Sequence, residues 1–229
     1  MNKTGGGRGT NQYRTRGSAT RANQVVPPTL TVTTNDPEDY DDQALIDRND
    51  TLFLFRIASS KNCPIPLLES LAKDKRGVIR EAVAANSNCP SDALEQLAKD
   101  EDSSVRFRVA QHKHLSPAIV TSLVHDQADF VRQEIAKRRN LRDADIEVLS
   151  KDRESLVRAE IASNPRCLAK ILSRLSKDKA YLVRIAVAKN RACPFDLLSI
   201  LARDINPMVR NQAINNPKLP IAMKIALSV

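Results

Sequence analysis

The sequence is poor in aromatic residues, cysteine and glycine, and each scarcity excludes a class of protein. Aromatic side chains make up 3% of the 229 residues and Trp is absent, which argues against a surface on which nucleic-acid bases or quaternary ammonium ions stack. Four Cys are too few for a disulfide framework. No apolar run approaches the roughly 20 residues of a membrane-spanning helix, and the N-terminus lacks a secretory signal core. We therefore expect a reduced, cytoplasmic protein without a membrane partner.

Glycine and charge are unevenly distributed along the chain. Residues 1–34 hold five of the six glycines, five basic residues and no acidic residue, which predicts a disordered tail. Residues 35–50 carry seven acidic residues against Arg48 alone. This segment is either a solvated linker or folds back on a basic surface of the tail or of the rest of the chain. We predict a disordered tail with its acidic linker over residues 1–44 and a folded domain over residues 45–229.

The folded part is a tandem repeat with a period of 26 residues. A leucine opens the phrase LAKD, or a close variant, at Leu71, Leu97, Leu123, Leu149, Leu175 and Leu201. With this leucine as repeat position one, position four is always Asp and position ten is always Arg. A degraded copy starts at Leu45 and the phrase restarts at Leu227. Atypical ends are expected of a stacked array, because each terminal unit has a single neighbour.

Each unit is predicted to form two short α-helices. The first runs from about position 20 into position three of the next unit, for example over residues 90–99, with proline in its first turn. The second begins near position six or seven, and its buried stripe consists of positions nine, ten, 13 and 14. Asn at position 16 is expected to end this helix in the left-handed conformation.

Neither helix could bury its apolar stripe alone, so the units must stack on one another. No segment shows the period of two that is typical of a strand. We therefore predict an all-α fold, a right-handed α-solenoid of about seven two-helix repeats, with the handedness inferred by analogy.

The repeated Asp and Arg predict a structural ladder. Arg at position ten lies on the flank of the buried stripe, so we expect it to span the inter-helix turn and bind Asp of its own or the next unit, together with turn carbonyls. The alternative is a row of Arg that faces phosphates, and the presence of one Asp for every Arg argues against it. The predicted ladder comprises Asp74, Arg80, Asp100, Arg106, Asp126, Arg132, Asp152, Arg158, Asp178, Arg184, Asp204 and Arg210.

The phrase L-A-K-D-x-x-x-x-V-R-x-x-V-A-x-N-x-x-C-P resembles the leucine-rich repeat variant family and also looks like HEAT repeats, over residues 45–229. Both families are mainly interaction scaffolds, so the resemblance implies an architecture rather than a specific function. The 26-residue unit is longer than that of the variant family, which implies two full α-helices instead of alternating α- and 3₁₀-helices. The chain lacks the Cys-rich N-terminal segment with which that family can hold an iron–sulfur cluster, so we expect no cluster.

No constellation of residues predicts catalysis, a cofactor or a metal. Cys63, Cys89, Cys167 and Cys193 share position 19 with Leu of the other units, so we expect them in the core rather than around a metal ion. His112 and His114 have no Cys partner and are expected in a surface loop. The folded part has one glycine and hence no phosphate-binding loop, and it shows no nucleophile–base signature. We predict that the protein is not an enzyme.

The loops that follow the second helices are basic, and in a solenoid they line one edge in register. Position three adds a second row of cations, among them Lys177, which suits the C-terminus of the first helix. We predict a monomeric scaffold that binds a protein partner, and the alternative is sequence-nonspecific nucleic-acid binding through the basic edge. The candidate residues for an anionic partner are Lys113, His114, Lys137, Arg138, Arg139, Arg142, Arg166, Lys189 and Arg191.

Overall fold

The computed structural model describes residues 50–227, without the side chain of Leu227. Residues 1–49 and 228–229 lie outside this description, and so do the predictions for the basic tail, the acidic linker and the start of the degraded copy. The chain divides into residues 1–38 and residues 39–229. All described residues belong to the second of these units.

Residues 50–227 form 14 α-helices and no strand, so the predicted all-α repeat array is confirmed. Every unit contains two full α-helices rather than an α- and a 3₁₀-helix. The first helices are α3 (Ile65–Leu71), α5 (Ser91–Leu97), α7 (Pro117–Val124), α9 (Asp143–Leu149), α11 (Ala169–Leu175), α13 (Phe195–Leu201) and α15 (Ile221–Leu227). The second helices are α2 (Thr51–Ala58), α4 (Gly77–Ala85), α6 (Ser103–Ala110), α8 (Asp129–Ala136), α10 (Ser155–Ser163), α12 (Tyr181–Lys189) and α14 (Pro207–Asn215).

The helix starts follow from the local sequence. Pro90 directly precedes α5, and Pro207 is the first residue of α14, where the missing backbone N–H costs no hydrogen bond. Asn206 caps α14 by accepting a hydrogen bond from the backbone N–H of Met208. The first helices end earlier than predicted: α5 stops at Leu97, and the next two residues form the turn toward α6.

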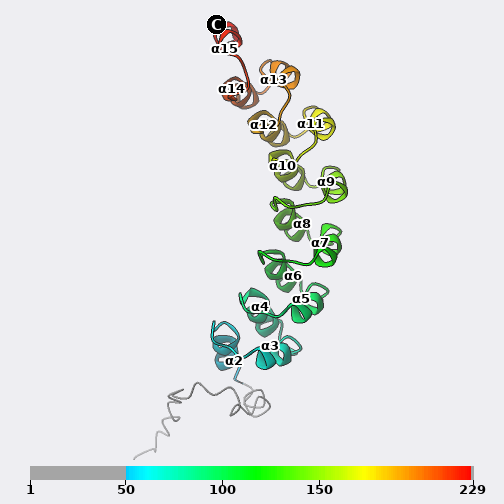
Figure 1. Cartoon of the computed structure of the whole chain (residues 1–229), viewed down its shortest axis with the longest axis vertical. Helices are drawn as coiled ribbons and strands as arrows, with labels where there is room; N and C mark the ends of the chain where they lie inside the picture. Colours follow the sequence, from blue (N-terminus) through cyan, green and yellow to red (C-terminus); the bar gives the residue numbers. More distant parts are fainter. Residues whose placement is uncertain (1–49, 228–229) are drawn as a thin grey trace, which may run out of the picture. The chain divides into compact units, whose positions relative to one another are not determined.

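The helices stack in two rows, the first helices in one and the second helices in the other (Figure 1). The stack formed by α2–α15 is curved, and the second helices lie on its inner, concave side (Figure 1). Successive second helices pack against each other more extensively than successive first helices do, as expected for the inner row of a curved array. The surface of the second helices that faces away from the first helices is therefore the concave face.

A continuous apolar core runs between the two rows. Val183, Val187 and Ala188 of α12 are fully buried, as their positions in the repeat predict. Leu54 is also fully buried and takes the place of the ladder Arg in the degraded first copy. Each helix of residues 50–227 has at most nine residues, and none of them is long and apolar enough to cross a membrane.

Candidate interaction surfaces

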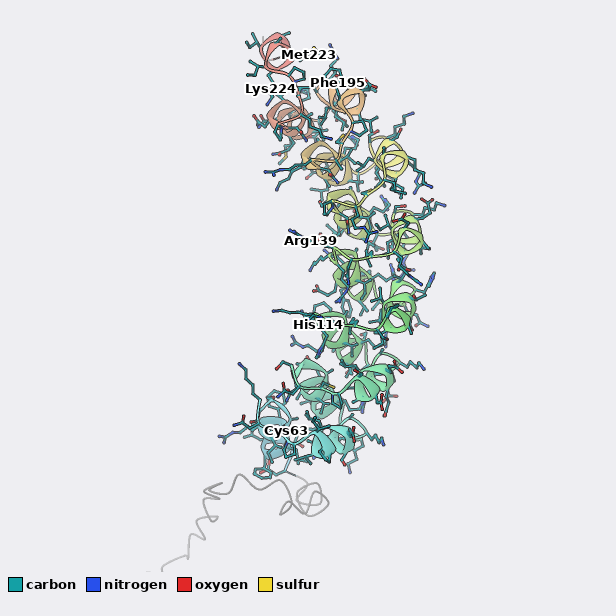
Figure 2. All side chains as sticks on the ribbon, viewed as in Figure 1. Cys63, His114, Arg139, Phe195, Met223 and Lys224 are labelled. Carbon is teal, nitrogen blue, oxygen red and sulfur yellow. The ribbon has the colours of Figure 1, made fainter. Side chains whose placement is uncertain are left out.

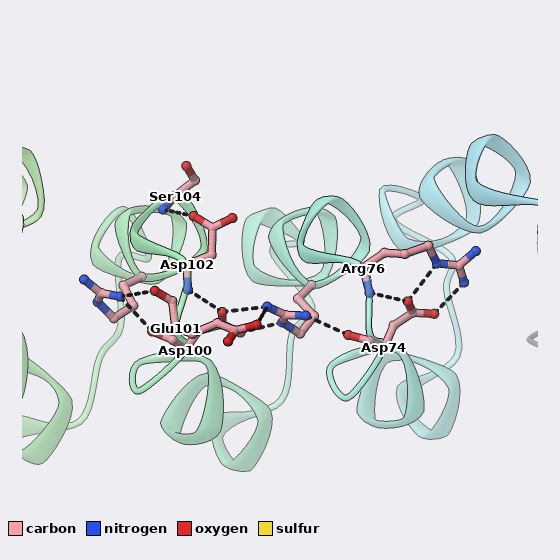
Figure 3. A network of polar contacts seen from close by, with 8 residues as sticks. Asp74, Arg76, Asp100, Glu101, Asp102 and Ser104 are labelled. Atoms are coloured by element: carbon pink, nitrogen blue, oxygen red, sulfur yellow. Dashed lines mark hydrogen bonds and ion pairs between the residues drawn. The ribbon is translucent and has the colours of Figure 1, made fainter.

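The Arg and Asp side chains of positions ten and four join each repeat to the next (Figure 3). In the best-buried example, Arg132 donates two hydrogen bonds to Asp152, from Nε to Oδ2 at 2.6 Å and from Nη2 to Oδ1 at 2.9 Å. Its Nη1 donates to the carbonyl of Asp126 in its own repeat at 2.8 Å. The same contacts recur from Arg80, Arg106, Arg158 and Arg184 to Asp100, Asp126, Asp178 and Asp204. Each of these guanidinium groups therefore links the inter-helix turn of its own repeat to the Asp carboxylate of the following repeat by hydrogen bonds.

Each ladder carboxylate also organises the turn in which it lies. Asp178 accepts a hydrogen bond from the backbone N–H of Ala180, the residue that caps α12, at 2.9 Å. Burial alone would raise the pKa of Asp178, but the hydrogen bonds from Arg158 and from Ala180 outweigh it and hold the pKa below its ordinary value. Asp178 therefore stays charged at neutral pH.

The two ends of the ladder are closed differently. Asp74 has no Arg in the preceding copy, and Arg76 of its own turn pairs with it instead at 2.6 Å. At the other end, Arg210 binds the carbonyls of Asp204 and Ile205 at 2.8 and 3.0 Å and has no carboxylate partner among residues 50–227. The interior guanidinium groups of the ladder within residues 50–227 are thus occupied by carboxylates and carbonyls rather than open to a phosphate backbone.

A second ladder lies at position 16, at the opposite ends of the second helices. Asn190 donates from Nδ2 to the carbonyls of Ala162 and Asn164 in the preceding repeat, at 2.6 and 3.0 Å. Its Oδ1 accepts from the backbone N–H of Ala192. The expected left-handed conformation is wrong, because Asn190 has φ −65° and ψ 125°. Asn recurs here because its amide satisfies buried carbonyls of the neighbouring repeat rather than because it tolerates a positive φ.

In two repeats a basic residue replaces this Asn and also contacts backbone carbonyls of the preceding repeat. His112 places Nε2 2.5 Å from the carbonyl of Ala84. Arg138 donates from Nη1 to the carbonyls of Ala110 and His112 and from Nη2 to that of Lys113. Burial lowers the pKa of Arg138, and its buried Nε has no acceptor among the described residues. Arg138 therefore points into the array and donates its Nη hydrogen bonds within the chain, so we leave it out of the exposed basic surface described below.

Other members of the predicted basic edge are paired within the chain. Arg142 donates two hydrogen bonds of 2.9 Å to Asp145 and another to Thr121. Lys137 pairs with Glu134 at 2.7 Å, and Arg166 approaches Asp143 at 3.9 Å. These contacts reduce the positive charge that the loops offer to a ligand.

Five basic side chains of the edge are exposed and have no ion pair within residues 50–227: Lys113, His114, Arg139, Lys189 and Arg191. His114 and Arg139 are labelled in Figure 2 and come from successive loops of the array. Arg139, Lys189 and Arg191 line one open cleft of about 730 Å³, together with Ser163 and Pro165. Three of the five free basic side chains therefore lie between α8 and α12, and Lys113 and His114 lie in the loop after α6.

The four Cys do not converge on a metal site. All four are buried at position 19 in separate repeats, and Cys193 is fully inaccessible. Burial raises the pKa of the Cys89 thiol to about 12 and contributes most to a pKa of about 11 at Cys193. Within residues 50–227 no group of three or more His, Cys, Asp or Glu side chains is placed to hold a metal ion.

The concave face carries a row of exposed apolar side chains that the sequence analysis missed. They occupy position eight, which lies opposite the buried stripe of the second helix at 100° per residue. Leu156 and Met208 expose 51% and 57% of their surface. We name this set the apolar row; it consists of Leu52, Val78, Phe130, Leu156, Leu182 and Met208, and Ser104 interrupts it. The sequence does contain a signal for this row, because six of the seven residues at repeat position eight are apolar.

Position eleven extends the apolar row on the concave face. Phe107 of α6 packs edge-on against Phe130 of α8, with ring centroids 5.6 Å apart. Phe55 of α2 is 40% exposed. Single exposed apolar residues are common on protein surfaces, whereas contiguous exposed apolar patches mark interaction sites. The exposed apolar residues of this face recur in register over successive repeats.

Comparisons with known proteins agree with this architecture. The family model described as leucine rich repeat variant matches residues 78–102. A solved structure described as a leucine-rich repeat variant with a novel repetitive protein structural motif superposes with a TM-score of 0.64 and 24% sequence identity, over 82% of this chain and 78% of the other. No curated protein matches the chain in sequence. The predicted resemblance to the leucine-rich repeat variant family is therefore confirmed, by one repeat in sequence pattern and by the array in fold.

Proposed function

We propose that the protein is a non-enzymatic scaffold that binds a protein partner on its concave face. The apolar row is the observation that carries this proposal. Leu156 and Leu182 are 51% and 40% exposed on neighbouring second helices, with Met208 next in line. Burial of such side chains stabilises a complex by about 25 cal/mol per Å² of apolar area. Their regular placement offers a partner several equivalent contacts on one rigid array.

The test compares the apolar row with equally exposed apolar residues elsewhere. The double variant Leu156→Ser/Leu182→Ser removes the centre of the row, and Ile200→Ser on first helix α13, where Ile200 is 63% exposed, is the matched control. Full-length protein and both variants are used to capture partners from native lysate, after nuclease treatment. We expect a protein that the unchanged chain and the control retain and the double variant loses. Retention by all three would overturn the proposal.

A second candidate function is sequence-nonspecific binding of nucleic acid, and the cleft lined by Arg139, Lys189 and Arg191 favours it. Such binding would weaken steeply with salt, because each phosphate contact releases a counterion. We expect binding to a random duplex at low salt to be lost in Arg139→Glu/Lys189→Glu and kept in Lys177→Glu, which reverses a charge at the opposite ends of the helices. Absence of binding at low salt would exclude this candidate.

A further inference from the structure

We propose that the partner segment is an extended, polyproline-II-like stretch with an apolar side chain at every third residue and acidic side chains between them. The inference rests on the proposed function and specifies the chemistry of the partner. It follows from three features of the concave face: the spacing of the apolar row, its curvature, and the charge that lies beside it.

The spacing of the row matches the pitch of one backbone conformation. Packed helices lie about 8–10 Å apart, so neighbouring residues of the row are separated by about that distance. A polyproline-II segment has three residues per turn and rises about 3.1 Å per residue, which brings every third side chain to the same side at intervals of about 9 Å. In a β-strand, the residues on one face are two apart, at about 6.6 Å, or four apart, at about 13 Å, and neither interval matches the spacing of this row.

The curvature of the array argues against a helical partner. A helix would present every seventh residue at about 10.5 Å, which also fits the spacing. However, a helix is straight over this length, whereas the inner row of second helices is curved (Figure 1). A polyproline-II segment has no internal hydrogen bonds, so it can follow the concave face at little cost.

The charge beside the row specifies the residues between the apolar contacts. Position 15 lies seven residues, or about 10 Å, along the same helix from position eight and on the same exposed side. At this position, Lys137 is the C-cap of α8 and Lys189 is the last residue of α12, and Arg139 and Arg191 follow in the adjoining loops. Three of these four line the cationic cleft. Carboxylates of a segment seated on the apolar row would therefore face Arg139, Lys189 and Arg191.

The two features coincide in the C-terminal half of the array. Phe130, Leu156, Leu182 and Met208 are consecutive members of the apolar row on α8, α10, α12 and α14, whereas Ser104 separates them from the earlier members. The cationic cleft spans the loops after α8 and α12. Four contacts three residues apart define a segment of about ten residues. We place the site on α8–α14.

The experiment selects random 16-residue peptides displayed on phage against the full-length protein. We expect the enriched sequences to share apolar residues three apart with Asp or Glu between them. A labelled consensus peptide is then compared with an isomer in which the same residues are reordered. Leu156→Ser is expected to weaken binding of the consensus peptide about tenfold, the loss that follows from one buried leucine contact, and Ile200→Ser to leave it unchanged. Lys189→Glu should weaken binding, and Lys177→Glu should not.

Several outcomes would overturn the inference. Enrichment of apolar residues at intervals of two, four or seven would indicate a strand or a helix as the partner. Equal binding of the reordered isomer would remove the role of spacing. A dimer that Leu156→Ser converts into a monomer would show that a second copy covers the row. If no peptide is enriched while capture from lysate still depends on the row, this inference fails and the proposed function stands; if capture is also independent of the row, both fail.

Discussion

Removal of one ladder arginine tests how the repeats are held together. Arg158 is 8% exposed and donates four hydrogen bonds, at 2.7 and 2.8 Å to Asp178 and at 2.7 and 2.9 Å to the carbonyls of Asp152 and Arg153. In Arg158→Ala the carboxylate of Asp178 retains a single described hydrogen bond, from Ala180. A buried charge left without its partner costs about 3–5 kcal/mol. Because the Asp178 side chain is 9% exposed and water can reach it, we expect a loss of about 2–4 kcal/mol.

Equilibrium urea unfolding, followed by the helical circular-dichroism signal, measures this loss. The chain provides two controls. Arg210→Ala occupies the same repeat position but removes only hydrogen bonds to carbonyls, so we expect a loss of about 1 kcal/mol. Arg153→Ala removes a side chain that is 74% exposed and lies 3.9 Å from Glu154, and stability should stay within about 0.5 kcal/mol. If Arg158→Ala costs no more than Arg210→Ala, the bidentate pair does not stabilise the array and the reasoning is refuted.

Three further predictions concern single groups. The pKa of Asp178 is lowered in the folded protein, so the contribution of this carboxylate to stability is present above its unfolded pKa of about 3.9 and is lost as pH falls through the folded value. The urea midpoint should therefore fall less between pH 7 and pH 2.5 for Arg158→Ala than for the unchanged chain. Because burial raises the pKa of Cys89 to about 12, a disulfide reagent at pH 8 should label this thiol far more slowly in the native protein than in guanidinium, and equal rates would place it at the surface. Arg138→Asn restores the residue that is common at position 16 and removes a buried Nε without an acceptor. The free energy of unfolding should therefore stay equal or rise by up to about 1 kcal/mol, and the thermal midpoint should stay equal or rise with it. A clear drop of the midpoint would show that the third hydrogen bond, to the carbonyl of Lys113, outweighs the cost of burying Nε.

The predicted basic edge shows that a charge pattern in the sequence does not tell which basic side chains are exposed. Arg138 and Arg139 are neighbours in the sequence, yet Arg138 is turned into the array and Arg139 is exposed. The positions of the two residues in the repeat place both in the same loop and hence on the same predicted basic edge. The distinction depends on which side chain reaches the open carbonyls of the preceding repeat, and those carbonyls come from residues 26 and 28 positions earlier.

The sequence alone determined the repeat, the two helices of each unit and the pairing of Arg with Asp, because these depend on local periodicity and on residue types that recur in strict register. The tertiary structure decided the rest. It showed that each Arg binds the carboxylate of the following repeat and the carbonyls of its own, a choice set by how far one unit is displaced from the next. It also showed that position eight, opposite the buried stripe, lies on a concave face that no further layer of the described residues covers. Periodicity tells which side of a helix avoids the core, but only the packing of whole units tells whether that side is left open to a partner.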